Sequence, residues 1–338
     1  MTPVNLQCRL AARPVGLPDA TDWAIVEKPK PAAADEEFVV EVDYLSIDPA
    51  MRTWMNAGRS YVPAVDIGEV MRAFAVGHVV ESHHREFAAG DQVSGMFGVQ
   101  RYAVSNGADV NKIDTTLAPA TTHLAALGIS GLTAYFGLLD IGRPEPSQTV
   151  LVSGAAGSVG NIVGQIAKIK GCRAVGIAGG EQKCRWLVEE AGFDAAIDYK
   201  TADLRAELKT HAPDGVDVFF DNVGGAVLEA ALNQLAGGAR IVLCGAVSQY
   251  NDTPRGPANY MQLLVARASM TGFVVFDYLA RYPEGIAQLV NWLNTGQLQS
   301  HEHIEHGDVG DFPETLLKLF SGENTGKLIL AFNDPSPL

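Results

Sequence analysis

The stretch 149-TVLVSGAAGSVGNIVGQIAKIKG-171 decides the fold. A β-branched run is followed by a glycine-rich turn and then by apolar residues at helical spacing, and Gly171 stands where a C-cap glycine is expected. The residues on one face of this helix are Val159, Ile162, Val163 and Ile166. The stretch therefore predicts a strand, a tight turn and a helix that packs against a sheet.

The turn itself predicts a phosphate-binding loop. Gly154, Gly157 and Gly160 form G-x-x-G-x-x-G rather than the strict G-x-G-x-x-G. Small residues let the backbone approach a pyrophosphate, and a helix that begins near Ser158 offers that anion unpaired N–H groups and the positive end of its dipole. Tight turns and close helix–strand packing also select glycine, so the turn gains weight only from the strands around it.

Five further short runs of strand-forming residues alternate with helical patterns, as in a series of βαβ units. With the first strand they make the six strands of a complete Rossmann sheet, which binds ligands at the carboxyl ends of its strands. A helical pattern also runs from Leu279 to Leu293. The predicted strands are 172-CRAVGIA-178, 195-AAID-198, 216-VDVFFD-221, 239-ARIVLCG-245 and 269-SMTGFVV-275.

The segments on either side of this region have a different texture. Residues 1 to about 120 contain short apolar runs such as 38-FVVEVDYLSI-47 and 75-AVGHVVES-82, separated by Gly, Pro and Asp, and the last forty residues return to mixed short segments. A length of 338 residues favours two domains. We therefore expect an antiparallel β domain with the Rossmann domain inserted into it.

Composition excludes several classes of protein. The formal net charge of −14 opposes binding to nucleic acid or to an anionic membrane surface. The sequence has no apolar run of transmembrane length and no charged-then-apolar leader, so we expect a cytoplasmic protein. The four cysteines lack C-x-x-C spacing, and we expect Cys8, Cys172 and Cys244, in apolar strand-like stretches, to be small buried hydrophobes; the fourth is Cys184.

The end of the second strand, 176-GIAGGEQKCRW-186, indicates which dinucleotide binds. An acidic side chain there would bind the ribose hydroxyls of NAD, but Gly179 and Gly180 occupy the tip. Lys183 and Arg185 follow and favour a 2′-phosphate, hence NADP(H). Glu181 argues the other way unless it complements the helix dipole, and the basic pair could also be an ordinary solvated helix face.

No metal site is expected from the sequence. A zinc alcohol dehydrogenase needs a Cys/His/Cys-type site, and His78 has no partnering cysteine. In 301-HEHIEH-306, His301 and His303 would share one face of a strand, yet no carboxylate motif lies nearby. These histidines are more simply interpreted as structural or surface residues.

The chain resembles the zinc-independent medium-chain dehydrogenases/reductases through 131-GLTAYFGLLDIG-142, 153-SGAAGSVG-160, 164-GQIAKIKG-171, 178-AGGEQKCR-185 and 217-DVFFDNVGG-225. Within them it is similar to the alkenal double-bond reductases, which include the leukotriene B4 12-hydroxydehydrogenase/prostaglandin reductases. The bacterial NADPH-dependent curcumin reductases are the nearer branch, through 46-SIDPAMR-52, 60-SYVPAVDIGEVM-71 and 244-CGAVSQYN-251. The resemblance implies an α/β fold, with a Rossmann NADP-binding domain (126–299) inserted into a GroES-like antiparallel β catalytic domain (1–125 and 300–338).

The resemblance also implies a set of cofactor contacts. Lys183 and Tyr199 match positions that hold the 2′-phosphate, Phe273 and Val275 match a strand that faces the nicotinamide, and Asn324 in 322-GENTGK-327 matches an asparagine that reaches the cofactor from the C-terminal segment. The predicted contacts are Thr133, Gly154, Ala156, Gly157, Ser158, Val159, Gly179, Lys183, Arg185, Tyr199, Asn222, Val223, Cys244, Gly245, Ala246, Tyr250, Phe273, Val275 and Asn324.

The substrate side is implied in the same way. Met51, Arg52, Tyr61 and Tyr260 are expected to border the substrate. Tyr61, Tyr250 and Tyr260 are the candidate catalytic proton donors, with solvent or the nicotinamide ribose hydroxyl as alternatives, although a lone tyrosine is as often a packing residue. Ala50 and 129-ISG-131 depart from the aromatic residue and the M-P-G common in relatives, which argues for a differently shaped substrate pocket.

These features favour an NADPH-dependent oxidoreductase acting on a CH–CH bond. Hydride addition to the β-carbon of an α,β-unsaturated ketone or aldehyde delocalises charge onto the carbonyl oxygen, so hydrogen-bond donors suffice without a metal. The alternatives are an NADPH:quinone oxidoreductase and a non-catalytic NADPH-binding protein. The expected partners are a small enone or alkenal and a second copy of the chain, which would contact the sheet edge near 269-SMTGFVVF-276.

Overall fold

The computed structural model describes residues 4–332. Contacts divide the chain into two compact units, Met1–Leu124 with Glu302–Leu338 as unit 1 and Ala125–His301 as unit 2. Within residues 4–332, no helix has the length and apolar character needed to cross a bilayer. The two units are described separately below.

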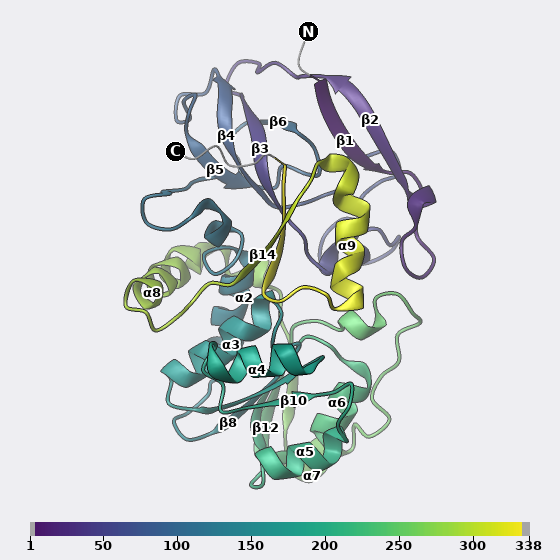
Figure 1. Cartoon of the computed structure of the whole chain (residues 1–338), viewed down its shortest axis with the longest axis vertical. Helices are drawn as coiled ribbons and strands as arrows, with labels where there is room; N and C mark the ends of the chain where they lie inside the picture. Colours follow the sequence, from purple (N-terminus) through teal and green to yellow (C-terminus); the bar gives the residue numbers. More distant parts are fainter. Residues whose placement is uncertain (1–3, 333–338) are drawn as a thin grey trace. The chain divides into compact units, whose positions relative to one another are not determined.

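Unit 2 contains a parallel sheet of six strands, all within the fully described segment Ala125–His301 (Figure 1). The spatial order is β10-β9-β8-β11-β12-β13, so the chain moves outward in one direction from β8 and then in the other from β11. The predicted Rossmann sheet is therefore confirmed. The strands are β8 (Thr149–Ser153), β9 (Arg173–Ala178), β10 (Ala195–Asp198), β11 (Val216–Asp221), β12 (Leu235–Leu243) and β13 (Ser269–Gly272).

The helices of unit 2 cover this sheet, and α3 is buried on more than one side. Ile162, Val163 and Ile166 are buried as the spacing predicts, while Val159 is partly exposed. Gln165 is buried as well, and its side-chain amide is satisfied by hydrogen bonds with the backbone N–H and carbonyl oxygen of Gln299. The helices are α2 (Ile129–Phe136), the π-helix η3 (Gly137–Gly142), α3 (Ser158–Ile169), α4 (Glu181–Glu189), α5 (Leu204–His211), α6 (Gly225–Leu232), η4 (Val247–Gln249), α7 (Gln262–Ala266), η5 (Val275–Arg281) and α8 (Tyr282–Asn294).

The two last strands of the sheet end earlier than predicted. β12 stops at Leu243 because the next two N–H groups, of Cys244 and Gly245, both donate to the carbonyl oxygen of Asp221. β13 pairs only with β12, in register up to Leu243–Gly272. The prediction of a strand up to Val275 is therefore wrong, since β13 has no partner beyond Gly272.

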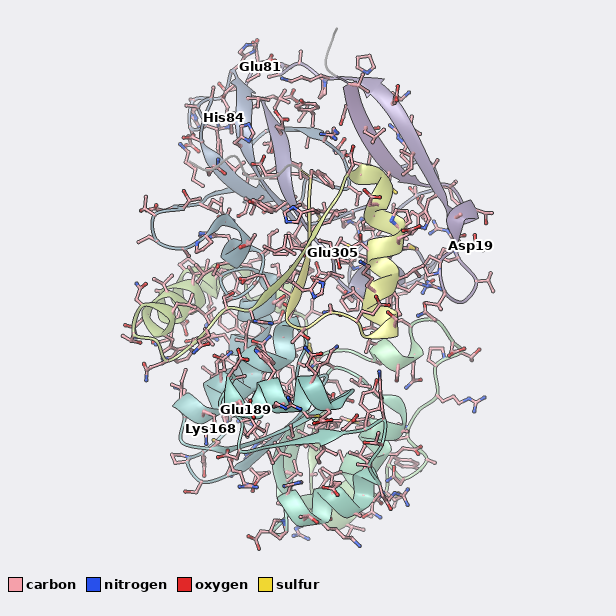
Figure 2. The ribbon with its side chains drawn as sticks, in the orientation of Figure 1. Asp19, Glu81, His84, Lys168, Glu189 and Glu305 are labelled. Carbon is pink, nitrogen blue, oxygen red and sulfur yellow. The ribbon has the colours of Figure 1, made fainter. Side chains whose placement is uncertain are left out.

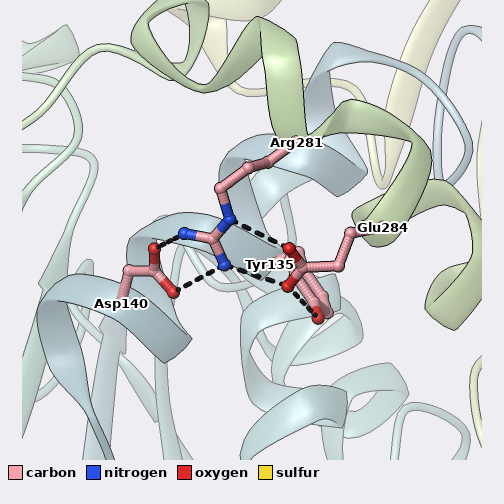
Figure 3. A network of polar contacts seen from close by, with 4 residues as sticks. All are labelled: Tyr135, Asp140, Arg281 and Glu284. Carbon is pink, nitrogen blue, oxygen red and sulfur yellow. Dashed lines mark hydrogen bonds and ion pairs between the residues drawn. The ribbon is translucent and has the colours of Figure 1, made fainter.

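The helix predicted from Leu279 to Leu293 is in fact two helices. Residues Val275–Arg281 form the 3₁₀-helix η5, and α8 begins at Tyr282, with a proline in its first turn that fits the start of a helix. Arg281 stands at this junction and donates to both Asp140 and Glu284, and Tyr135 donates to Glu284 (Figure 3). These contacts tie the ends of α2 and η3 to the start of α8.

Unit 1 is built on a sheet of seven strands in its described part. The order is β14-β15-β3-β4-β5-β7, with β6 beside β3, and a separate hairpin pairs β1 with β2. All pairs are antiparallel, as predicted, except β14 with β15, which is parallel. The strands are β1 (Val4–Leu10), β2 (Trp23–Pro29), β3 (Phe38–Ser46), β4 (Ala75–Ser82), β5 (Gln92–Gly95), β6 (Tyr102–Ser105), β7 (Asn111–Lys112), β14 (Glu302–His306) and β15 (Lys327–Ala331).

The helices of unit 1 pack on one apolar core that joins its two chain segments. Phe312 lies edge-on to Trp23 at 5.4 Å between ring centroids, and both belong to the core with Leu45 and Met51. Glu305 of β14, labelled in Figure 2, pairs with Lys318 at 2.8 Å and so connects strand and helix at the surface. The helices are η1 (Ala20–Asp22), α1 (Ala50–Trp54), η2 (Ala120–His123), η6 (Val309–Asp311) and α9 (Phe312–Ser321).

Candidate functional site

The glycine-rich turn after β8 has the geometry of a phosphate cradle. Gly154 has a positive φ of 57°, which favours glycine. A Cβ at Gly160 would lie 2.3 Å from the carbonyl oxygen of Gly154, so this position has no room for a side chain. Ala156, between them, is buried. The turn therefore brings the start of α3 against the end of the strand.

The start of α3 has unsatisfied donors. Its N-cap residue is Gly157, and no side chain caps the helix. The hydroxyl oxygen of Ser158 is buried and has no hydrogen-bond partner in the described structure. A buried hydroxyl without a partner costs free energy, and it fits an anion held at this helix N-terminus. The residues present thus fit a dinucleotide pyrophosphate.

Two of the other helices that follow strands of this sheet also lack a side-chain cap, and a third has one. α4 begins after Gly180 and α6 after Gly224, and neither has a side-chain cap. In contrast, α5 is capped by Asp203, whose carboxylate accepts from two backbone N–H groups. Backbone donors are therefore left without side-chain caps after β8, β9 and β11.

A buried polar network links the ends of β8 and β11, where the strand order reverses. The carboxylate of Asp221 accepts from the Ser153 hydroxyl at 2.7 Å and from the N–H groups of Val223 and Gly224, both at 3.0 Å. Asn222 donates its side-chain amide to the carbonyl oxygen of Ser153 at 2.7 Å. Burial raises the pKa of Asp221, and the network holds the 221–225 turn beside the cradle.

The turn that follows β12 contains four predicted cofactor contacts, Cys244, Gly245, Ala246 and Tyr250. The Tyr250 hydroxyl accepts from the N–H of Ala246 at 3.2 Å, so this predicted proton donor also closes its own turn. Burial raises the pKa of the Cys244 thiol to about 12, which leaves it unreactive at neutral pH. As a whole residue Cys244 is only half-buried, so the prediction of a small buried hydrophobe is confirmed for Cys8 and Cys172 and wrong for Cys244.

At the end of β9, the two predicted basic residues have different surroundings. Arg185 pairs with Glu181 one helical turn earlier at 2.6 Å. Glu181, which favoured NAD in the sequence, therefore pairs with Arg185, which favoured NADP. Lys183 is half-buried, and its pKa is lowered by burial and by the nearby charge of Lys200, which the sequence analysis did not single out.

The end of β10 organises this tip. Asp198 accepts from the N–H of Gly180 at 2.8 Å and from the N–H of Lys200 at 3.0 Å. These hydrogen bonds lower its pKa. Tyr199 follows directly, half-exposed, and its ring would contact a Cβ placed on Gly179 at 2.9 Å. In the sequence, the only sign of a role for Asp198 and Lys200 is their position beside Tyr199 in 197-IDYK-200.

The predicted nicotinamide-facing residues do not lie on a strand. Phe273 follows β13, and a Cβ on Gly137 would be 2.5 Å from its ring. Val275 is buried in η5. Thr133 in α2 donates its hydroxyl to the carbonyl oxygen of Ile129 at 2.6 Å. Their assignment as cofactor contacts stays a prediction, but the strand predicted to carry Phe273 and Val275 is wrong.

In unit 1, the predicted substrate residues Met51 and Arg52 are both buried. Met51 is fully buried in the apolar core. Arg52 is 4% exposed, and its guanidinium donates to the carbonyl oxygens of Gly16 and Pro14 and to Asn56. Burial lowers its pKa. Both side chains hold α1 in the fold, and their place beside the substrate stays a prediction.

The other two predicted substrate residues are exposed tyrosines, each within its own unit. Tyr61 is 52% exposed and accepts from the indole N–H of Trp54 at 3.3 Å, which orients the phenol ring. Tyr260 is 59% exposed and lies just before α7. Both hydroxyls can therefore reach a small molecule.

Two motifs far apart in sequence meet in unit 1 through a buried lysine. Lys327 is 1% exposed, and its ammonium donates to the carbonyl oxygen of Ile47 at 3.1 Å and to Asp48 at 2.5 Å. Asn324, the predicted C-terminal cofactor contact, is buried and donates to the carbonyl oxygen of Gly326 at 3.0 Å. The ion pair fixes the loop that carries Asn324 to the segment before α1.

Among residues 4–332, no group of three or more His, Cys, Asp or Glu side chains is placed to hold a metal ion. His78 on β4 contacts Asp43 at 3.0 Å, which raises its pKa. His303 contacts Glu305 at 2.9 Å. His301 precedes β14 and its ring lies 4.5 Å from that of Trp186, so the shared strand face predicted for His301 and His303 is wrong.

Two family models match the chain. Residues 6–113 match a model described as the N-terminal domain of oxidoreductase. Residues 158–293 match one described as zinc-binding dehydrogenase. Together they span much of both units.

Three curated relatives match over nearly the whole length. YfmJ of Bacillus subtilis, named as an NADP-dependent oxidoreductase, is 45% identical over 99% of this chain and 100% of its own. The NADPH-dependent curcumin reductase of Escherichia coli is 40% identical over 96% of both chains. The NADP⁺-dependent 2-alkenal reductase of Nicotiana tabacum is 37% identical over 96% of this chain and 97% of its own.

A solved structure has the same fold throughout. CurA from Vibrio vulnificus in complex with NADPH is 41% identical, with a TM-score of 0.92 over 98% of this chain and 100% of its own.

Proposed function

Since the chain belongs to the alkenal and prostaglandin reductase family of medium-chain dehydrogenases/reductases, we propose that it is an NADPH-dependent reductase of the C=C bond of α,β-unsaturated ketones and aldehydes. The observation that carries the proposal is the cradle at the start of α3, with its uncapped N-terminus and buried, unpaired Ser158 hydroxyl. The names of the relatives and the NADPH complex of CurA agree with it. A Rossmann domain (126–299) then serves the cofactor, and a GroES-like domain (1–125 and 300–338) serves the substrate.

Binding of NADPH is divided between three strand ends of unit 2. The N–H groups at the start of α3 and the Ser158 hydroxyl donate to the pyrophosphate. Lys183 and Tyr199 hold the 2′-phosphate, at a tip where Gly179 replaces the acid of NAD-binding proteins. The 221–225 turn, held by Asp221, lines the cofactor at the reversal of strand order.

The bound cofactor supplies the hydride that adds to the β-carbon. The chain has to orient the enone and donate hydrogen bonds to the carbonyl oxygen, on which negative charge develops. Tyr260 of unit 2, which is half-exposed, is the donor proposed for this role. Tyr61 of unit 1 and Tyr250, whose hydroxyl closes its own turn, are the alternative candidates. Because hydrogen bonds suffice for this spread charge, the reaction is proposed to be independent of zinc.

The position of the label in the product tests the proposal. 4-Phenyl-3-buten-2-one is incubated with NADPH carrying deuterium in the transferred position, and the product is identified by mass spectrometry and NMR. Deuterium on the β-carbon of the saturated ketone is expected. An allylic alcohol with deuterium on the carbinol carbon, or turnover with quinones alone, would contradict the proposed reaction.

We also propose a cytoplasmic homodimer that forms through the free edge of the unit 2 sheet. β13 is the last strand in the order, and Ser269, Thr271 and Gly272 on it are exposed. Leu264 and Val265 of the adjacent α7 are 68% and 67% exposed, and an uncovered apolar edge invites association. Light scattering at micromolar concentration tests this, and a monomer would argue against it.

A further inference from the structure

The end of β10 places a second lysine at the tip of β9. Asp198 accepts from the backbone N–H groups of Gly180 and Lys200, and its other oxygen accepts from the Thr201 hydroxyl at 3.2 Å. One carboxylate therefore connects the turn before α4 to the chain after β10. The main chain at Lys200 is held against the same tip at which the 2′-phosphate is proposed to bind.

The side chain of Lys200 folds over that tip. A Cβ on Gly179 would lie 2.9 Å from the Cε atom of Lys200 and 2.9 Å from the ring of Tyr199. The φ of Gly179 is not positive, so a side chain there would disturb the approach of Lys200 and Tyr199 and not the backbone. Among residues 4–332, the ammonium of Lys200 forms no ion pair within 4.0 Å, in contrast to the guanidinium of Arg185.

Lys183 and Lys200 are close enough for each charge to act on the other. Burial lowers the pKa of Lys183, and the charge of Lys200 lowers it further, as expected for two neighbouring cations. Two ammonium groups brought together repel each other, and the carboxylate of Asp198, whose pKa the charge of Lys200 helps to lower, is an anion close to Lys200. A doubly charged phosphate monoester would relieve this repulsion.

Asp198 itself is a poor partner for ribose hydroxyls. In NAD-binding proteins an acid at the end of the second strand accepts from those hydroxyls. Here the acid stands at the end of the third strand, β10, and its oxygens already accept from two backbone N–H groups and one hydroxyl. It therefore acts on the tip and not on the cofactor.

We propose that Lys200 binds the 2′-phosphate together with Lys183, and that Asp198 is the positioning residue that sets the preference for NADPH by holding Gly180 and Lys200 in place. This inference rests on the proposed use of NADPH. The proposed 2′-phosphate site is then Lys183, which follows β9, with Lys200, which follows β10, in place of the predicted pair Lys183 and Arg185.

Binding of cofactor fragments tests the role of Lys200 without any turnover. Calorimetry of the full-length protein measures Kd for 2′,5′-ADP and for 5′-AMP, which lacks the 2′-phosphate. Lys200→Met is expected to raise Kd for 2′,5′-ADP about tenfold or more and to leave Kd for 5′-AMP unchanged. Lys209→Met removes an exposed lysine of α5 and controls for net charge. Equal Kd values for Lys200→Met and wild type would overturn the proposal.

Two substitutions of Asp198 separate its hydrogen bonds from its charge. Asp198→Ala removes the acceptor and is expected to raise Kd for 2′,5′-ADP roughly 3- to 30-fold. Asp198→Asn keeps an acceptor oxygen for both N–H groups and removes a negative charge, so its Kd is expected to equal or fall below that of wild type. In steady-state assays, Asp198→Ala is expected to raise KM for NADPH while kcat stays the same.

The outcomes distinguish this inference from the proposed function. Wild-type protein that binds 2′,5′-ADP no better than 5′-AMP would refute the use of NADPH. A wild-type preference that survives both Lys200→Met and Asp198→Ala would leave NADPH use intact and refute the roles of these two residues. Should Asp198→Ala fail to fold, Lys200→Met still tests the role of Lys200. An Asp198→Asn variant that binds 2′,5′-ADP more weakly than wild type would refute the role of the Asp198 hydrogen bonds.

Discussion

Replacing Ser158 by alanine is expected to stabilise the protein without cofactor. The hydroxyl oxygen of Ser158 is buried and unpaired, and a polar group in that state costs about 1–3 kcal/mol. Alanine removes this cost. For a unit the length of Ala125–His301, about 1 kcal/mol raises Tm by roughly 2–4 °C, so the apo variant is expected to melt at least that much higher than wild type.

The same substitution is expected to weaken NADPH binding. If the Ser158 hydroxyl donates to a pyrophosphate oxygen, its loss removes a hydrogen bond to a charged acceptor, about 1.5–3 kcal/mol. This corresponds to a Kd for NADPH about 10- to 150-fold higher. Stability and affinity therefore change in opposite directions, which a merely structural serine would not produce.

Thermal unfolding with and without NADPH, together with a fluorescence titration of NADPH, measures both effects. Ser153→Ala is the matched control, because the Ser153 hydroxyl is also buried but has partners: it donates to Asp221 and accepts from the N–H of Asn222 at 2.8 Å. It is expected to lower Tm of the apo protein. A Ser158→Ala variant with lower apo Tm and unchanged Kd for NADPH would refute the assignment of the cradle.

Three further outcomes are expected. Lys183→Ala raises KM for NADPH about 10- to 150-fold and leaves that for NADH nearly unchanged, whereas Arg185→Ala changes neither much because Arg185 is paired with Glu181; equal losses with both cofactors would contradict this. Tyr260→Phe lowers kcat about 10- to 1000-fold in the enone assay with Kd for NADPH intact, and an unchanged kcat would remove Tyr260 from the reaction. Activity survives exhaustive chelation and elemental analysis finds no stoichiometric zinc; activity lost on chelation and restored by Zn²⁺ would overturn the metal-free mechanism.

The parallel sheet could be predicted because its signals are local. β8, β10 and β11 have the predicted bounds, since buried parallel strands appear in the sequence as short, mainly apolar runs. The end of β13 could not be predicted, because it depends on where its partner β12 stops. Gly237 and Gly238, which suggest a loop, instead lie inside β12.

The candidate site shows the same division. The cradle at Gly154–Gly160 is contiguous in sequence, and the structure gives it the expected geometry. The position of Arg185 shortly after the second strand predicts a phosphate contact, but in the structure its guanidinium pairs with Glu181 one helical turn earlier. Lys200 follows β10, and it lies beside Gly179 at the end of β9 because β10 and β9 are neighbours in the sheet. The burial of Arg52, at 4% exposed, could not be predicted from the sequence, because it depends on carbonyl groups of Pro14 and Gly16 far along the chain.

The position of β15 has a consequence for synthesis on the ribosome. β15 lies between β14 and β3 inside the unit 1 sheet, and Lys327 at its start is buried against Asp48. At about 5–20 residues per second, Lys327 is translated roughly 15–55 s after Ser46. Until β15 is made, the Tyr44–Ser46 end of β3 lacks this partner, although β4 and β6 can already pair with other residues of β3. The six strands of Ala125–His301 are complete before β15 is made. Among the strands before residue 125, β3 is therefore the one whose pairing is completed last during synthesis.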